Sequence, residues 1–331
     1  MVNDSLPRKH SYNTAQPSAK RRKVLAATGA LVSSIGLAGC SGGGGSSNEF
    51  LTLATGSTGG TWFPIGGALA DLWTDELDAT VTAESTGGAI ENVRLLEDGS
   101  ADIGMVFSNT AVQAVNGEDP FDGAVDVQAL FGMFSAHTHM VSLAGAGVES
   151  PEDLEGLRVS VGQPGSGTGQ IAELVLEFLG VRDSIEERQL DLQEQANAMR
   201  NGQLDVGFWS NSIPSPSVQE LATNREVSFY DFSDEIEDMT SQNDFLTQAE
   251  IPAETYSGQT DPVVNPGISN FVFAPSDADE DTIYTMVNST FSNLDRLEAA
   301  NEAVGEFEST ARSVSIELHP GADRALSDND L

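Results

Sequence analysis

Beyond residue 49, short apolar runs alternate with longer stretches in which apolar residues recur every three or four positions. The short runs predict strands and the longer stretches predict helices. The predicted strands are 50–54, 81–84, 103–107, 129–134, 140–143, 158–161, 188–192, 206–209, 227–230 and 271–274. The predicted helices are 66–75, 89–97, 169–179, 194–201, 216–223 and one from about 282 into the 290s. This alternation is typical of α/β sheets with parallel strands.

Glycine, serine and threonine concentrate at four junctions between a predicted strand and the following helix, at 55–61, 85–88, 107–110 and 162–169. Such loops lie at the carboxyl ends of strands, where N–H groups and hydroxyls face a crevice and can hold an anion at a helix N-terminus. Ordinary helix capping is the alternative for each loop alone. Neither a phosphate-gripping loop, which needs a lysine, nor a dinucleotide fingerprint, which needs a third glycine, fits them.

These junctions, with the segment around residue 209, define a predicted ligand site. Its residues are Gly59, Gly60, Thr61, Trp62, Ser85, Gly88, Asn92, Ser108, Asn109, Gly165, Ser166, Gly167, Thr168, Trp209, Ser210 and Asn211. We expect backbone N–H groups and hydroxyls of residues 60–61 and 166–168 to hold a ligand carboxylate, because no arginine lies inside the four junctions. Trp62 and Trp209 adjoin the loops and are equally compatible with a place in the core.

Candidates for catalysis are few. His137 and His139 are two residues apart in a predicted strand, so both imidazoles lie on one face, a spacing compatible with a metal ion. No third ligand is identifiable, and neither a nucleophile elbow nor a lysine is present in this region. The sequence therefore predicts a binding protein without catalytic residues, metal or cofactor, and a metal-dependent enzyme is the disfavoured alternative.

Charge is distributed very unevenly along the chain. From residue 41 onward there is no lysine, and nine arginines face fifty acidic residues, a formal charge of −41. Nucleic acid and anionic membrane surfaces are disfavoured as partners. The composition resembles that of proteins from extreme halophiles, in which molar salt screens carboxylate repulsion. We therefore expect the folded state to require high salt.

The first forty residues carry the features of an export signal. A basic patch with Arg21 and Arg22 precedes an apolar stretch of 16 residues, too short to span a bilayer as a helix. The segment 37–40 resembles a lipobox, which predicts lipidation of Cys40, the only cysteine. A twin-arginine lipoprotein signal is thus predicted over 1–40, followed by a flexible Gly/Ser tether over 41–49. The expected location is the outer face of the cytoplasmic membrane.

Several motifs in a fixed order resemble the TAXI family, the solute receptors of one branch of the tripartite ATP-independent periplasmic (TRAP) transporters. Gly59-Gly60-Thr61 and Pro164-Gly165-Ser166-Gly167-Thr168 are among them. The segments that carry the resemblance are 54–66, 85–96, 101–104, 153–162, 164–168, 213–216, 251–256 and 318–322.

The resemblance implies an α/β, type II periplasmic-binding-protein fold, with two α/β lobes and a ligand cleft between them. The first lobe would comprise 50–137 and 275–331, and the second 138–274. The implied partners are the integral-membrane TRAP subunits. The implied solutes are small carboxylates or amino acids such as glutamate, glutamine or 2-oxoglutarate. A receptor of an ATP-driven (ABC) importer, which would share fold and anchor, is the alternative.

The chain departs from the family pattern in three places, each of which bears on the ligand. Trp62-Phe63 stands where two tyrosines are common, and Asn109 stands where an aspartate is usual. The segment 209–212 replaces a smaller one. A narrower or differently shaped cleft is expected.

Overall fold

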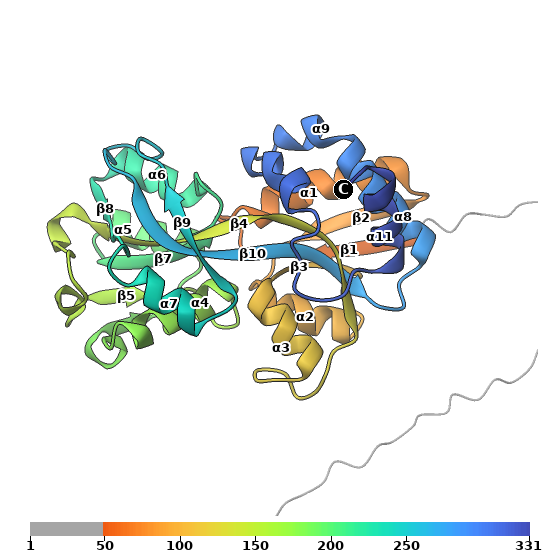
Figure 1. Ribbon diagram of the computed structural model, residues 1–331. Helices are drawn as coiled ribbons and strands as arrows, with labels where there is room; N and C mark the ends of the chain where they lie inside the picture. Colours follow the sequence, from red (N-terminus) through yellow and green to blue (C-terminus); the bar gives the residue numbers. More distant parts are fainter. Residues whose placement is uncertain (1–48) are drawn as a thin grey trace, which may run out of the picture. The chain divides into compact units, whose positions relative to one another are not determined.

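A single mixed sheet runs through two lobes in the computed structural model, which describes residues 49–331 (Figure 1). The strands are β1 (Glu49–Ala54), β2 (Ala79–Glu84), β3 (Ile103–Phe107), β4 (Val127–Leu143), β5 (Arg158–Ser160), β6 (Glu186–Arg188), β7 (Val206–Asn211), β8 (Val227–Phe229), β9 (Leu246–Ile251) and β10 (Val263–Pro275). The helices are α1 (Trp62–Glu76), α2 (Ala89–Glu97), α3 (Ser108–Asn116), α4 (Gly167–Phe178), α5 (Leu192–Arg200), α6 (Pro216–Asn224), α7 (Ile236–Gln242), α8 (Glu280–Ser292), α9 (Leu294–Glu298), α10 (Phe307–Thr310) and α11 (Pro320–Asp328).

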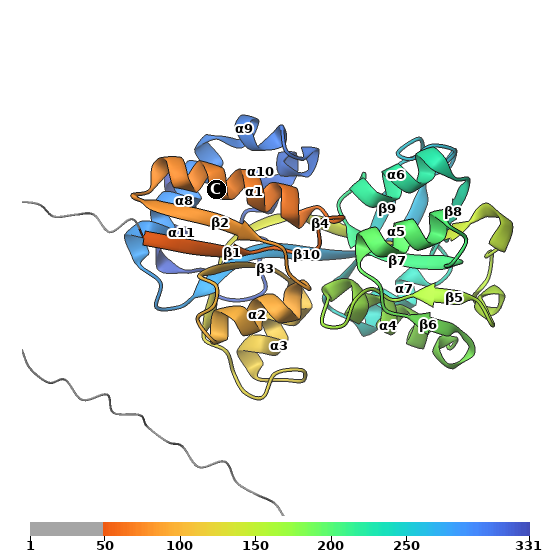
Figure 2. The same cartoon turned by 180° about the vertical axis from the view of Figure 1, so that it is seen from behind.

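The sheet has the strand order β2-β1-β3-β10-β4-β7-β5-β6, with β8 added to β4 and β9 added to β10. In the first lobe β1 pairs in parallel with both β2 and β3, and in the second β5 pairs in parallel with both β6 and β7. Helices α1, α2, α3, α8 and α11 belong to the first lobe, and α4 to α7 belong to the second (Figures 1 and 2). The predicted α/β architecture with two lobes is confirmed.

Two long strands, β4 and β10, cross from one lobe to the other side by side (Figure 1). The chain continues without a break through 135–139, so the two strands predicted at 129–134 and 140–143 are one. Strand β4 begins to pair with β7 at His137. On the return, β10 pairs with β9 up to Ile268 and with β3 from Asn270 onward. The second crossing therefore lies near Ser269, earlier in the chain than the predicted boundary at 275.

Some elements differ from the sequence prediction. Helix α3 begins directly at the end of β3, where a loop was expected over 107–110. Strand β6 ends at Arg188, and 188–192 is not a strand, because Asp191 instead caps the N-terminus of α5 through the N–H groups of Gln193 and Glu194. Strand β9 has no counterpart in the prediction, since only its first and last residues are buried.

A large cluster of buried apolar residues runs through the first lobe and continues into the second. The indole of Trp73, on α1, is fully buried, and its N–H donates to the carbonyl oxygen of Met286 and the hydroxyl of Thr290 on α8, both at 3.0 Å. A buried indole requires such a partner, because an unpaired N–H in the core would be costly. This residue thus joins α1 to α8.

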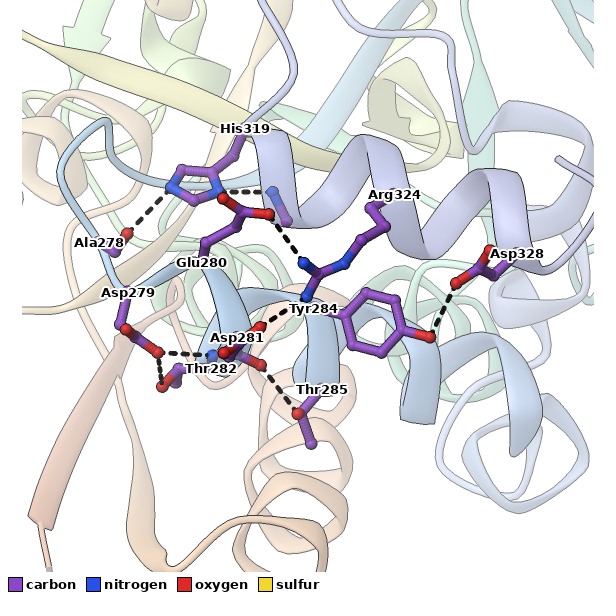
Figure 3. Close-up of polar contacts among 11 residues, drawn as sticks. Ala278, Asp279, Glu280, Asp281, Thr282, Tyr284, Thr285, His319, Arg324 and Asp328 are labelled. Atoms are coloured by element: carbon purple, nitrogen blue, oxygen red, sulfur yellow. Dashed lines mark hydrogen bonds and ion pairs between the residues drawn. The ribbon is translucent and has the colours of Figure 1, made fainter.

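The C-terminal helix α11 is fastened to α8 by a set of polar contacts (Figure 3). The Arg324 guanidinium lies 4.3 Å from the Tyr284 ring centroid and donates to carboxylates of Glu280 and Asp281, each at 2.8 Å. At the start of α11, Nδ1 of His319 accepts the N–H of Gly321 at 3.2 Å, while Nε2 lies 3.2 Å from the carbonyl oxygen of Ala278. The chain end is thereby held on the first lobe.

The predicted signal over 1–40, the tether and the lipidated Cys40 lie outside the described residues, apart from Glu49, which begins β1. Within 49–331, no helix combines the length and apolar character that crossing a bilayer would need.

Candidate functional site

A cavity of about 50 Å³ lies between the lobes, where the loops after β1 and β2 face the loops after β5, β6 and β7. By the same measure about 10–15 Å³ holds one water, so the cavity has room for a few water-sized groups. Its lining residues are Gly56, Ser57, Gly60, Thr61, Trp62, Gly87, Gly88, Phe107, Gln163, Ser166, Gly167, Thr168, Asp191, Leu192, Ser210 and Asn211.

On the side of the first lobe, a tight turn brings the chain from β1 into α1. The N–H of Gly60 donates to the carbonyl oxygen of Ser57 at 3.0 Å, which closes the turn. The Ser57 hydroxyl is inaccessible to solvent and has no hydrogen-bond partner within the protein. The Trp62 ring packs on Phe107 with 4.8 Å between centroids, and its indole N–H donates to Asn270 on β10. This wall therefore presents two aromatic rings and one unused hydroxyl.

On the side of the second lobe, the wall is the N-terminus of α4. Ser166 is the N-cap: its hydroxyl oxygen accepts the N–H of Gly169 at 3.0 Å and donates to the carbonyl oxygen of Gln163 at 2.8 Å. The one hydrogen of this hydroxyl is therefore already used in this arrangement, and its role as a ligand donor stays a prediction. Gly167 and Thr168 are the first two helical residues, and the N–H groups of such residues have no partner within a helix.

The lobes touch through hydrogen bonds between uncharged groups. The N–H of Thr61 donates to Oδ1 of Asn211 at 3.0 Å, and the Thr61 hydroxyl lies 2.7 Å from that of Ser212. The N–H of Ile90 donates to the carbonyl oxygen of Gly165 at 3.2 Å. The described arrangement is thus a closed one, in which each lobe forms one wall of the cavity.

Two glycines allow the lobes to come this close. A Cβ on Gly167 would lie 1.9 Å from Cδ2 of Phe107 in the opposite lobe. A Cβ on Gly59 would lie 2.7 Å from the backbone nitrogen of Gln193, again in the opposite lobe. Both separations are far below van der Waals contact, so a side chain at either position would hold the lobes apart.

Asp191 is the one charged residue that lines the cavity among the described residues. One of its carboxylate oxygens caps α5, accepting the N–H groups of Gln193 and Glu194 at 2.8 and 2.7 Å. None of the nine arginines lines the cavity: Arg94, for example, is exposed on α2 and donates to the carbonyl oxygen of Pro120. Arg158 pairs with Asp205, an interaction that lowers the pKa of that carboxyl group.

Nine of the sixteen predicted site residues line the cavity: Gly60, Thr61, Trp62, Gly88, Ser166, Gly167, Thr168, Ser210 and Asn211. The other seven do not: Gly59, Ser85, Asn92, Ser108, Asn109, Gly165 and Trp209.

Most of these seven have structural partners. Asn92 is fully buried and its amide donates to the carbonyl oxygens of Thr55 and Met105, which joins α2 to β1 and β3. The Trp209 indole lies in the core of the second lobe, where its N–H donates to Ser217 and Leu192.

The remaining members of this group lie near the interlobe boundary. Asn109 donates to Gln170 of α4 at 3.3 Å, and the Ser85 hydroxyl donates to the carbonyl oxygen of Gly56 at 3.0 Å. Gly59 and Gly165 make the interlobe contacts described above. The Ser108 hydroxyl is buried without a protein partner, and this residue borders a separate groove formed by α3 and residues 244–247.

Sequence reasoning missed seven lining residues: Gly56, Ser57, Gly87, Phe107, Gln163, Asp191 and Leu192. Five of them lie within the junctions that it singled out. Asp191 and Leu192 were assigned to a strand, although Asp191 followed three residues later by Glu194 is the signature of a capping box at a helix N-terminus. That signal could have placed Asp191 at the N-terminus of a helix that faces the cleft.

The two histidines of β4 are buried, and they do not belong to a metal-binding cluster. Among residues 49–331, His, Cys, Asp and Glu side chains form no group of three or more suited to a metal ion. Nε2 of His139 lies 2.8 Å from the Tyr256 hydroxyl, and its Nδ1 faces two backbone carbonyls. Burial lowers the pKa of both imidazoles from 6.5 to about 4.

A family model, described as the NMT1-like family, matches residues 53–328. The chain is also similar to the solved structure of MatC from Rhodopseudomonas palustris with bound malate, with a TM-score of 0.57, 14% identity, and coverage of 85% of this chain and 98% of that chain. It is also similar to PhnD1 from Prochlorococcus marinus in complex with methylphosphonate, with a TM-score of 0.54, 11% identity, and coverage of 85% of this chain and 97% of that chain. For the periplasmic binding protein BugD the TM-score is 0.54 and the identity 13%, with coverage of 86% of this chain and 95% of that chain. These likenesses confirm the periplasmic-binding-protein fold.

Proposed function

This chain belongs to the NMT1-like family, and we propose that it is an exported solute-binding receptor of a transport system, which closes its two lobes around a small polar solute. The observation that carries the proposal is the interlobe cavity, to which both lobes contribute neutral hydrogen-bond donors at helix N-termini. Such a site can hold a ligand and release it when the lobes part. The described lining residues include no His, Cys, Lys or Arg that could serve as a nucleophile or base.

Within this class we propose the TAXI branch of TRAP transporters, with the integral-membrane TRAP subunits as partners. The support is the ordered set of motifs, of which Gly59-Gly60-Thr61 and Pro164 to Thr168 contribute residues to the cavity lining from opposite lobes. Tethering through Cys40 would keep the receptor near its permease. The alternative is an ABC importer, which shares this fold. A permease gene of the TRAP type beside the gene for this chain would favour the first, and an ATPase gene would favour the second.

We propose a small carboxylate or amino acid, such as glutamate, glutamine or 2-oxoglutarate, as the solute. The free N–H groups of Gly167 and Thr168 lie at the positive end of α4, which favours an anion. The malate of MatC and the methylphosphonate of PhnD1 are small anions held by the same fold. Because the cavity has room for only a few water-sized groups, the lobes must part slightly to enclose a solute of ten heavy atoms.

The proposal is tested by identifying the solute and then removing one donor. Protein purified in high salt is denatured, the released small molecules are identified by mass spectrometry, and binding is measured by calorimetry with L-glutamate, L-glutamine, 2-oxoglutarate and malate. The Ser57→Ala variant removes the one lining hydroxyl that is buried without a partner, so it should weaken binding about 3- to 100-fold with an unchanged melting temperature.

Arg94→Gln is the matched control, because this exposed arginine lies outside the cavity. If no solute is released and none of the four compounds binds, the proposed solute class is wrong. If Arg94→Gln abolishes binding while Ser57→Ala leaves it unchanged, a salt bridge holds the anion instead.

A further inference from the structure

A chain of buried hydrogen bonds runs from the centre of the second lobe to the interlobe contact. It begins at His139 on β4, passes through the Tyr256 hydroxyl to the backbone N–H of Ser215, and continues from the Ser215 hydroxyl to Asn211. The Asn211 side chain then accepts the N–H of Thr61 from the opposite lobe. The four distances are 2.8, 2.7, 3.2 and 3.0 Å, and all five residues are more than nine-tenths buried.

The direction of each bond follows from the partners. Nδ1 of His139 lies 2.9 and 3.1 Å from the carbonyl oxygens of His137 and Trp209, which can only accept, so Nδ1 carries the proton. Nε2 of the neutral ring must then accept, so the Tyr256 hydroxyl donates to it and uses its oxygen to accept the N–H of Ser215. The donor and the acceptor of each of these hydrogen bonds are therefore fixed.

The last two links orient the Asn211 amide. Its Nδ2 donates to the Ser215 hydroxyl, which leaves Oδ1 directed at Thr61. An amide turned the other way would place its N–H donors against the Thr61 N–H, which can only donate, and the bond between the lobes would be lost. The Thr61 N–H therefore fixes Oδ1 as its acceptor, and the Ser215 hydroxyl, just before α6, holds the other end of the amide in place.

We propose that Tyr256, His139 and Ser215 are positioning residues for lobe closure, which hold Asn211 so that it accepts the N–H of Thr61, and that protonation of His139 weakens this arrangement. The inference rests on the proposed function only in that closure is what captures the solute. None of the three positioning residues lines the cavity, so they act through Asn211 and not by touching the ligand.

Protonation of His139 reverses the bond at Nε2. The Tyr256 hydroxyl would then accept from Nε2 and from Ser215, and its own hydrogen would be left buried without an acceptor. The titratable groups that face His139 are His137 on the same strand and Tyr256 after β9, while Trp209 of β7 and Phe229 of β8 are uncharged. Burial and the neighbouring His137 lower the pKa of His139 to about 4, so the hydrogen bond between Asn211 and the Thr61 N–H should be strongest at neutral pH and weaken in acid.

The Thr61 amide reports directly on the end of the chain and requires no solute. Its hydrogen-exchange rate is measured by NMR at fixed pH in the full-length protein and in the variants Tyr256→Phe and Ser215→Ala. Both variants should speed exchange about three- to tenfold, the factor that the loss of one ordinary hydrogen bond produces. Tyr230→Phe is the matched control, because it removes a hydroxyl that bonds Glu235 elsewhere in the same lobe.

Unchanged Thr61 exchange in Ser215→Ala overturns the proposal even if Tyr256→Phe fails to fold. An equal increase in Tyr230→Phe overturns it as well, because the effect would then be general loosening of the lobe.

The pH dependence separates positioning from a purely structural role. The Thr61 amide nitrogen shift should follow a transition with a midpoint near pH 4 in the wild type. His139→Gln should abolish it, because a glutamine oxygen can accept from Tyr256 but does not titrate. A transition that persists unchanged in His139→Gln belongs to another group and refutes the pH coupling. Absence of solute binding with intact Thr61 coupling would refute the proposed function alone.

Discussion

Gly167 offers the sharpest test of whether lobe closure determines solute affinity. It is the first residue of α4, and its Cα faces the Phe107 ring across the lobe boundary. A methyl group there would lie 1.9 and 2.3 Å from Cδ2 and Cε2 of that ring. The backbone at Gly167 is helical, so alanine fits the local conformation and the perturbation falls on the interlobe contact alone.

The expected magnitude follows from overpacking. The Phe107 ring cannot retreat freely, because Trp62 packs against it at 4.8 Å and the residue is only 4% exposed. Forcing a methyl into such a contact costs about 1–3 kcal/mol. Since the cost applies to the closed form only, the dissociation constant should rise about 5- to 150-fold for the Gly167→Ala variant. The open form avoids the clash, so the melting temperature without solute should stay nearly the same.

Calorimetry with the solute that co-purifies measures the affinity, and small-angle X-ray scattering of the solute-bound protein measures closure. Gly67→Ala is the control, because Gly67 lies on helix α1 and a Cβ at this position would have no neighbouring atom within 4 Å. Phe107→Leu combined with Gly167→Ala should recover part of the lost affinity by making room for the methyl group. If Gly167→Ala binds as tightly as the wild type and closes as fully, the described interlobe packing does not govern capture.

Three further outcomes are expected. The pKa of His137 and His139 is about 4 in the folded chain and 6.5 when unfolded, so the unfolded chain takes up protons first and stability is lost as pH falls from 6.5 to 4. The free energy of unfolding should change by at most about 1.4 kcal/mol per pH unit per histidine. Urea titrations of a His137→Asn, His139→Asn double variant should show no such pH dependence, and an equal dependence in both proteins would refute this prediction. Low salt should unfold the chain, since seven of its nine described arginines pair with carboxylates and most acids remain uncompensated; an unchanged circular dichroism spectrum after dialysis would contradict this. His319→Ala should lower the free energy of unfolding by about 1–3 kcal/mol, because the ring caps Gly321 and bonds Ala278 (Figure 3), and urea curves that match the wild type would show that the cap is dispensable.

The sequence predicted the elements in which the pattern of apolar and polar residues matches the burial of the element. Strand β3 is buried throughout and was found at its observed bounds, as was helix α2 with its apolar face. The continuity of β4 was missed because residues 135–139 include Ser135, His137, Thr138 and His139, and polar residues ordinarily end an apolar run. They lie in the strand because they sit where the sheet passes between the lobes, and the side chains of Thr138 and His139 find hydrogen-bond partners there.

The candidate site was half predicted, for a similar reason. Glycine and serine at strand ends mark loops that approach a crevice, which located nine lining residues. What they approach depends on contacts between distant parts of the chain. Thr61 and Asn211 are 150 residues apart, and one sequence contains no signal that pairs them. Trp209 shows the converse: it adjoins the site in sequence, but strand alternation turns its indole into the core while Ser210 faces the cavity.

The interlobe contacts also bear on the extreme acidity of the chain. At about 1 M salt the Debye length is roughly 3 Å, so ion pairs between lobes would be screened strongly. The hydrogen bonds of Thr61, Ile90 and Gln163 across the boundary join uncharged groups, and the ion pairs of the described arginines lie within a lobe. A surface of mutually repelling carboxylates is therefore compatible with a cleft that is closed by uncharged hydrogen-bond donors. The high salt that we expect the fold to require would therefore leave the closing contacts, and the uncharged hydrogen bonds proposed for the solute, largely unaffected.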